Sequence, residues 1–62
     1  MQINHNRHVA VILDTNEPPY RLFGNMQAQD DESIVIRGTV GDYMNKDLVI
    51  LKSNIKYVEV HE

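Results

Sequence analysis

The sequence contains no cysteine and no tryptophan, and its apolar runs are only a few residues long. Without cysteine there is no disulfide framework, so the composition gives no sign of an oxidising compartment. A transmembrane helix needs about 20 consecutive apolar residues, and no run approaches that length. The opening residues Met1–His5 are polar and predict no signal peptide. We therefore expect a cytoplasmic protein with no membrane partner.

The sequence also has few residues arranged as catalytic or metal-binding motifs. The segment 38–41 has two glycines but lacks the lysine and helix of a phosphate-binding loop. His5 and His8 are three apart, and such residues point to opposite faces of an extended chain. His61 joins them only if the chain ends meet, so a metal site is a weak prediction. We predict no enzyme activity, no catalytic residue, no metal ligand and no cofactor.

The chain is short and slightly acidic. Its 62 residues predict one domain over residues 1–62, with residues 1–7 as a flexible or edge-paired lead-in. A domain of this size buries only about 60% of the surface that its unfolded chain exposes. Small proteins without disulfides often gain stability by oligomerisation, so we expect a homo-oligomer. The net charge of −3 argues against a strong hold on a phosphate backbone.

The segment from Leu48 to Val60 has the clearest β pattern. An apolar run, Leu48–Leu51, is followed by the polar turn Lys52–Asn54 and by the β-branched and aromatic run Ile55–Val60. This pattern predicts two short strands joined by a sharp turn. A two-stranded hairpin is not stable alone in water, so the preceding residues must supply a larger sheet.

Three further strands are predicted before this segment, at His8–Leu13, Tyr20–Ala28 and Ser33–Arg37, with a short strand at Thr39–Val40 as an additional possibility. Both faces of His8–Leu13 are apolar, which is typical of a strand covered on both sides or by a partner chain. Alternation in Tyr20–Ala28 places Ala28 on the same face as Met26, and Gly24 marks a bend or a close backbone approach. The prediction is an all-β fold: a small, strongly bent five-stranded barrel that closes on itself.

This strand order resembles the Sm-like fold, in particular its bacterial Hfq-like branch, and more generally SH3-like barrels. Val9–Leu13 resembles the first strand of that family, and Leu22–Met26 resembles its leucine-x-glycine-x-aliphatic second strand. Asp30 stands where the family has an aspartate before the third strand, and Ile50–Ile55 resembles its tyrosine-lysine-histidine-alanine-isoleucine segment. The resemblance implies a ring in which the fourth and fifth strands pair between subunits.

Several positions depart from the family pattern. Glu32 stands near the place of the aromatic residue on which Hfq-like proteins stack a base, and Ser53 replaces the histidine after the lysine. The N-terminal helix of the family is missing, and the segment between the third and fourth strands is longer. These departures concern ligand binding more than the fold.

Two binding functions remain open on the sequence alone, besides a structural oligomer with no ligand. The first is a non-catalytic, ring-forming protein that binds RNA or small nucleotides at Lys52, Ser53 and Asn54, with Asp30 contributing. Exposed aromatic side chains would add base stacking. They are Tyr20, Phe23, Tyr43 and Tyr57. A structural interpretation is also open, in which Phe23 and Tyr57 are barrel residues and Lys52 is a solvated lysine of the turn. The alternative is a protein-interaction module, an inhibitor or accessory factor, that uses the acidic run Asp30–Asp31–Glu32.

Overall fold

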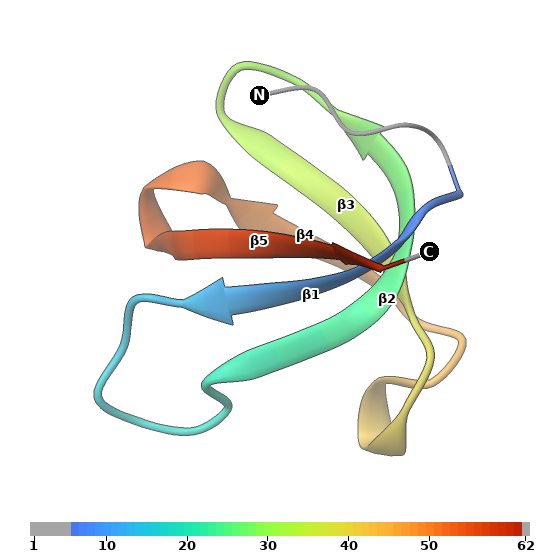
Figure 1. Cartoon of the computed structure of the whole chain (residues 1–62), viewed down its shortest axis with the longest axis horizontal. Coiled ribbons are helices and arrows are strands. Elements are labelled where there is room, and N and C mark those ends of the chain that lie inside the picture. The colour runs from blue at the N-terminus through green and yellow to red at the C-terminus, as the bar shows by residue number, and fades with distance from the viewer. Residues whose placement is uncertain (1–5, 62) are drawn as a thin grey trace.

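The computed structural model describes residues 6–61, which form one antiparallel sheet of five strands. The strands are β1 (His8–Leu13), β2 (Arg21–Gln29), β3 (Ser33–Gly38), β4 (Asp47–Leu51) and β5 (Ile55–His61). Two single 3-10 turns, η1 (Gly41–Tyr43) and η2 (Lys52–Asn54), precede β4 and β5. The spatial order is β4-β3-β2-β1-β5 (Figure 1). The predicted all-β, strongly bent five-stranded fold is confirmed. Among residues 6–61 there is no helix long and apolar enough to cross a membrane.

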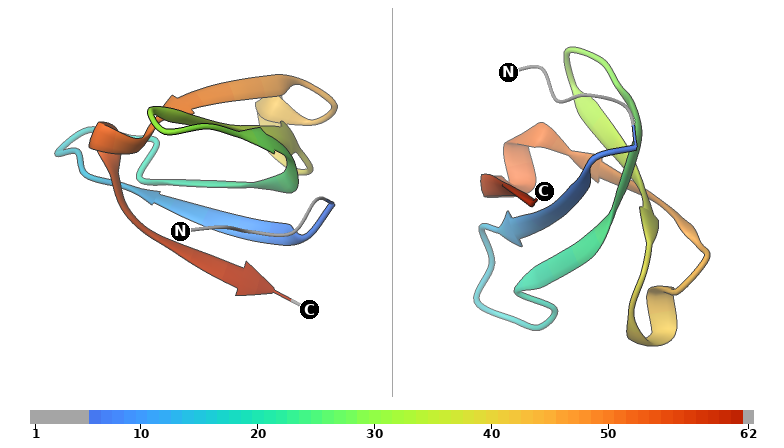
Figure 2. Two further views of the ribbon diagram at one scale, coloured as in Figure 1. Left: turned by 90° about the horizontal axis from the view of Figure 1, so that it is seen from above. Right: turned by 45° about the vertical axis from the view of Figure 1, so that its right-hand side comes forward.

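The sheet bends over itself but does not close, because β4 and β5 are its two edges. Figure 2 shows these edge strands in different layers of the bent sheet. The prediction of full closure is therefore wrong for a single chain. The prediction that β4 and β5 pair as a hairpin is also wrong: η2 carries the chain from one edge of the sheet to the other. Both edges keep backbone groups that pair with no strand of the described sheet.

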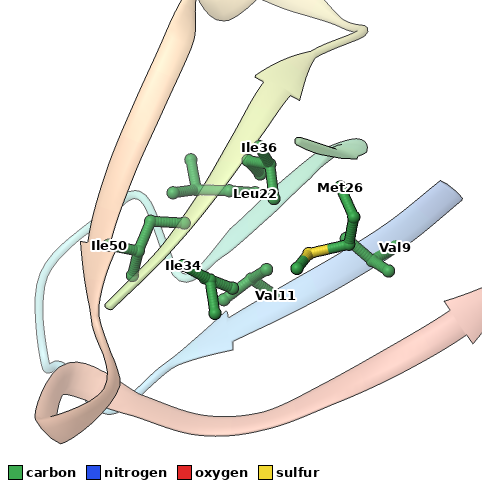
Figure 3. Close-up of a cluster of buried hydrophobic side chains, with 7 residues drawn as sticks. All are labelled: Val9, Val11, Leu22, Met26, Ile34, Ile36 and Ile50. Atoms are coloured by element: carbon green, nitrogen blue, oxygen red, sulfur yellow. The ribbon is translucent and has the colours of Figure 1, made fainter. Parts of the chain in front are cut away.

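The core lies inside the bend and is entirely aliphatic apart from one methionine (Figure 3). It contains Val9, Val11, Leu22, Met26, Ile34, Ile36 and Ile50. Ala10, on the opposite face of β1, is also fully buried, whereas Ile12 on that face is half-buried. Ala10 lies between its cross-strand partners Phe23 of β2 and Glu59 of β5.

Gly24 lies where β2 crosses close to β3. A Cβ atom at this position would lie 2.5 Å from the carbonyl oxygen of Arg37, so the predicted close backbone approach is confirmed. Further along β2 the register with β3 shifts between Met26 and Ala28. This irregularity removes Ala28 from the core face, and its side chain is exposed. The predicted shared face of Met26 and Ala28 is therefore wrong.

The segment between β3 and β4 is a compact turn, and the short strand suggested at Thr39–Val40 is absent from it. Instead, the N–H of Thr39 donates to the carbonyl of Phe23 at 3.1 Å, and Gly41 adopts a φ of 60°. At the start of the described chain, the N–H of Asn6 donates to the carbonyl of Met26 at 2.8 Å. Asn6 therefore continues the pairing of β1 with β2, and residues 1–5 of the predicted lead-in lie outside the described residues.

Candidate functional site

Two turns that are far apart in sequence meet beside the end of β4. The N–H of Lys52, the first residue of η2, donates to the carbonyl of Glu32 at 2.7 Å. At the other end of η2, the carbonyl of Asn54 accepts from the N–H of Asp14 at 2.8 Å. The predicted site residues Lys52–Asn54 are therefore held between the β2–β3 turn and the β1–β2 loop (Figure 1).

Asp30 organises the β2–β3 turn. Its Oδ1 accepts hydrogen bonds from the N–H of Glu32 at 2.9 Å and the N–H of Ser33 at 2.8 Å, and from the Ser33 hydroxyl at 3.2 Å. These backbone N–H groups, together with weaker contributions from the Ser33 hydroxyl and the Lys52 ammonium, lower the pKa of the Asp30 carboxyl. The Oδ1 atom of Asp30 is therefore engaged in hydrogen bonds that stabilise the turn.

The side chains of η2 are accessible. Lys52 is half-buried, whereas Ser53 and Asn54 are exposed. The 3-10 turn presents one ammonium, one hydroxyl and one amide, which together can contact a phosphate and the edge of a base. The flanking loops are acidic, however, with carboxylates at Asp14, Glu17, Asp30, Asp31 and Glu32. Lys52 therefore lies between two loops that carry carboxylates.

A shallow hollow of about 460 Å³ lies between the β2–β3 turn and the outer face of β4. We call it the acidic notch; it is lined by Asp30, Asp31, Glu32, Ser33, Val49 and Leu51. Val49 and Leu51 are 70% and 51% exposed. The sequence interpretation did not identify these two residues as functional. The signal was present, since the unbroken apolar run of β4 places apolar side chains on both faces.

A second hollow of about 580 Å³ lies on the core side of the β4 edge, between that strand and the β1–β2 loop. We call it the β4 groove. Leu13, Leu22 and Ile50 are among its apolar lining, and Asp14 and Glu17 stand among its polar lining. Both hollows therefore border the same free edge strand, and Val49 and Leu51 contribute to the lining of both.

The aromatic side chains do not gather at η2. Tyr57 is 49% exposed and lies on β5 opposite Ile12 of β1, on the face away from the core. Tyr43 belongs to η1, and the Tyr20 hydroxyl donates to the carbonyl of Asn16 at 3.4 Å. Phe23 is half-buried on β2. None of the four lines the acidic notch or the β4 groove.

His8 of β1 and His61 of β5 are directly opposite one another in the sheet. Their ring centroids are 5.8 Å apart, and the planes meet at 88°. The His8 Nε2 lies 3.3 Å from the Thr39 hydroxyl, and the His61 Nε2 lies 3.8 Å from a Glu59 carboxylate oxygen. Within residues 6–61, no three His, Asp or Glu side chains gather as a metal site requires. His5 lies outside the described residues.

Comparison of the chain with protein-family models and with curated proteins found no match.

Proposed function

We propose that this protein is a non-catalytic, ring-forming binding protein of the Sm-like type, acting in the cytoplasm on RNA or small nucleotides. The observation that carries the proposal is the strand order β4-β3-β2-β1-β5, with β4 and β5 as the two edges. In the Sm-like fold that the sequence resembles, these two strands pair between subunits. Pairing of unlike edges is heterologous, and such contacts build closed rings when the rotation closes.

Ring formation would also offset the repulsion between a phosphate ligand and the carboxylates near η2. In one chain, carboxylates around Lys52 oppose the approach of a phosphate. In a ring, the η2 turns of all subunits converge, so several ammonium, hydroxyl and amide groups contact one ligand. Ser53 and Asn54 would hydrogen-bond base edges, and Lys52 would contact phosphate.

The test is binding of a fluorescent single-stranded RNA and of free nucleotides, with the oligomer mass measured by native mass spectrometry. We expect the Lys52→Ala protein to keep its oligomeric mass and lose affinity. The slope of the logarithm of affinity against the logarithm of salt concentration should become shallower by about one for each Lys52–phosphate contact that is lost. The matched control is Lys46→Ala, which removes the same charge from the β3–β4 turn. Equal RNA affinity of the wild-type and Lys52→Ala proteins would remove η2 as the site.

The acidic notch favours a second candidate function, which is binding of a partner protein. Exposed Val49 and Leu51 beside Asp31 and Glu32 form an apolar floor with a negative rim, a combination suited to a basic segment with apolar anchors. A protein that co-purifies and survives nuclease treatment would support this function. Recovery of nucleic acid alone would contradict it.

A further inference from the structure

β4 is an edge strand without the usual protection of an edge. Natural sheet edges are commonly blocked by a bulge, a proline or a lysine. β5, the other edge, has a register shift against β1 and an exposed lysine, Lys56, at that shift. β4 pairs with β3 in one continuous register and contains neither lysine nor proline. Of the two edges, β4 is therefore the more open to a further strand.

The open edge of β4 presents the backbone groups of alternate residues. Residues of an antiparallel strand bond alternately to the neighbour on each side. The N–H of Lys52 donates to the carbonyl of Glu32 at 2.7 Å, in line with the β3–β4 register, so Ile50 also bonds to β3. Val49 and Leu51 therefore direct their N–H and C=O groups to the open edge. An extended segment can bond to these groups as a sixth strand.

The acidic notch and the β4 groove meet at this edge, because Val49 and Leu51 contribute to the lining of both. Directly opposed residues of an antiparallel pair place their side chains on the same side of the sheet. A residue opposite Ile50 therefore extends to the core side, over the groove. Residues opposite the exposed Val49 and Leu51 extend to the outer side, at the notch. A paired segment thus sends alternate side chains into the two hollows.

The charges around both hollows select a basic segment. Asp31 and Glu32 line the notch, and Asp14 and Glu17 line the groove. Among residues 6–61, no lysine, arginine or histidine lines either hollow, and no ion pair engages these four carboxylates. The aliphatic stem of a lysine opposite Leu51 covers that side chain while its ammonium reaches the notch carboxylates. The edge therefore favours a basic segment over an acidic one.

The apolar surface of the edge sets two further positions of the segment. A β-branched residue opposite Val49 covers a side chain that is 70% exposed. A larger apolar residue opposite Ile50 reaches the groove lining of Leu13 and Leu22. From its N-terminus, an antiparallel segment therefore carries a basic, a large apolar and a β-branched residue in that order.

We propose that the open edge of β4 binds an extended basic segment of a partner protein as an antiparallel sixth strand. Its basic residue lies opposite Leu51, its large apolar residue opposite Ile50 and its β-branched residue opposite Val49. The inference rests on the second candidate function and gives that partner its chemistry and its mode of binding. Backbone bonds supply affinity, and the two hollows supply sequence preference. Because the proposed ring uses the same edge, one β4 holds either the partner or another copy.

A chain whose β4 is free of other copies makes the test independent of assembly. The N–H of Leu13 donates to the carbonyl of Tyr20 beside β2, so the alternate residues of β1, Ile12 among them, bond to β5. Tyr57 is the partner of Ile12, so Val60, three residues further, directs its N–H to the open edge. Proline is tolerated at such an edge position. Val60→Pro therefore removes a donor that β5 offers to another copy and leaves β4 unchanged.

The probe is a short fluorescent peptide with lysine, leucine and valine at its centre and threonines on both sides. As an antiparallel strand it bonds to β4 through the N–H groups of its lysine and valine, while its leucine N–H points away. We expect the probe to bind Val60→Pro, and to bind wild-type protein diluted until it is monomeric. N-methylation of the valine should weaken binding by about tenfold, and N-methylation of the leucine, the matched control, should have little effect. Fluorescence anisotropy measures the affinities.

Two variants of the monomeric protein test the backbone and charge contacts separately. Val49→Pro removes the edge N–H without touching the bonds to β3, so it should weaken probe binding by about tenfold, whereas Val49→Thr should retain it. Asp31→Asn/Glu32→Gln should also weaken binding by about tenfold or more. Asp42→Asn/Glu59→Gln removes two carboxylates outside the hollows and should leave binding unchanged. Circular dichroism checks that each variant folds.

Equal binding of the two N-methylated peptides, or no binding of the probe to folded monomer, would overturn the inference. A co-purifying protein that is lost with Asp31→Asn/Glu32→Gln but kept by Val49→Pro would overturn strand addition while leaving partner binding at the notch. Single-stranded RNA bound by Val60→Pro in place of the probe would overturn both and support the first candidate function. A monomeric wild-type protein that binds the probe with the expected N-methylation pattern would overturn the ring and support this inference.

Discussion

The backbone N–H of Lys52 donates to the carbonyl of Glu32 at 2.7 Å, joining the β4–β5 turn to the β2–β3 turn. The bond extends the β3–β4 ladder by one residue pair beyond Ser33 and Leu51. It brings the one lysine of η2 beside the acidic run, although twenty residues of sequence separate the two. Both candidate functions therefore use one surface, and experiments must separate their contributions.

Asp30 should make the folded state less stable as the pH falls. Because its pKa is lowered in the folded chain, its contribution is present above the ordinary carboxyl pKa and is lost as pH falls through the folded value. Asp30→Asn keeps an acceptor oxygen without the charge, so its melting temperature should fall less than that of wild type between about pH 7 and about pH 3. Asp30→Ala loses the acceptor and should melt lower even at neutral pH. Identical acid profiles of wild type and Asp30→Asn would contradict this role.

Gly24→Ala should destabilise the fold by about 1–3 kcal/mol, because its Cβ would lie 2.5 Å from the Arg37 carbonyl oxygen. The matched control is Gly41→Ala, where a Cβ meets no atom within 4 Å. That variant is strained only by the φ of 60°, at a cost of about 1 kcal/mol. Urea denaturation measures both. A larger loss for Gly41→Ala would show that β2 and β3 can separate locally.

Ile36→Ala should leave most of the protein unfolded. Ile36 is fully buried, and truncating such a side chain costs about 2–5 kcal/mol. A core this small supplies only about 3–5 kcal/mol of net stability. The neighbouring Arg37→Ala breaks an exposed 3.3 Å ion pair with Asp47 and should cost less than about 1 kcal/mol. Thermal melts followed by circular dichroism should separate the two clearly.

The double variant Asp31→Lys/Glu32→Lys separates the two candidate functions. Its acidic notch carries lysines, so a partner protein that docks there by charge should be lost from pull-downs. RNA affinity should stay unchanged or rise, since positive charge is added beside Lys52. Loss of RNA binding in a double variant that stays folded and assembled would contradict binding at η2.

Much of the secondary structure was predictable because it depends on local pattern. Alternation and β-branched residues located β1, β3 and β5 to within one residue at each end, and Gly24 was correctly assigned to a close approach. Ala28 was misplaced because a register shift changes which residues share a face without changing the local composition. The hairpin of β4 and β5 was wrong because a short polar turn does not show whether its flanking strands pair.

The candidate site was predictable only in parts. Lys52–Asn54 and the run Asp30–Asp31–Glu32 were each recognised as polar turns, because polar residues between apolar runs mark turns. Their contact depends on the pairing of β3 with β4, and long-range pairing is not encoded in either turn. The exposure of Val49 and Leu51 likewise depends on β4 being an edge strand.

The sequence by itself determined an all-β chain, the positions of its turns and the absence of cysteine chemistry, because local periodicity and composition suffice for these properties. Only the tertiary structure decided which strands are edges, which turns meet and which apolar side chains remain outside the core. The physical reason is that backbone hydrogen bonds satisfy β1, β2 and β3 on both sides within the chain, whereas β4 and β5 are each satisfied on one side. Those two edges are where the backbone of the described sheet is free to pair with another strand.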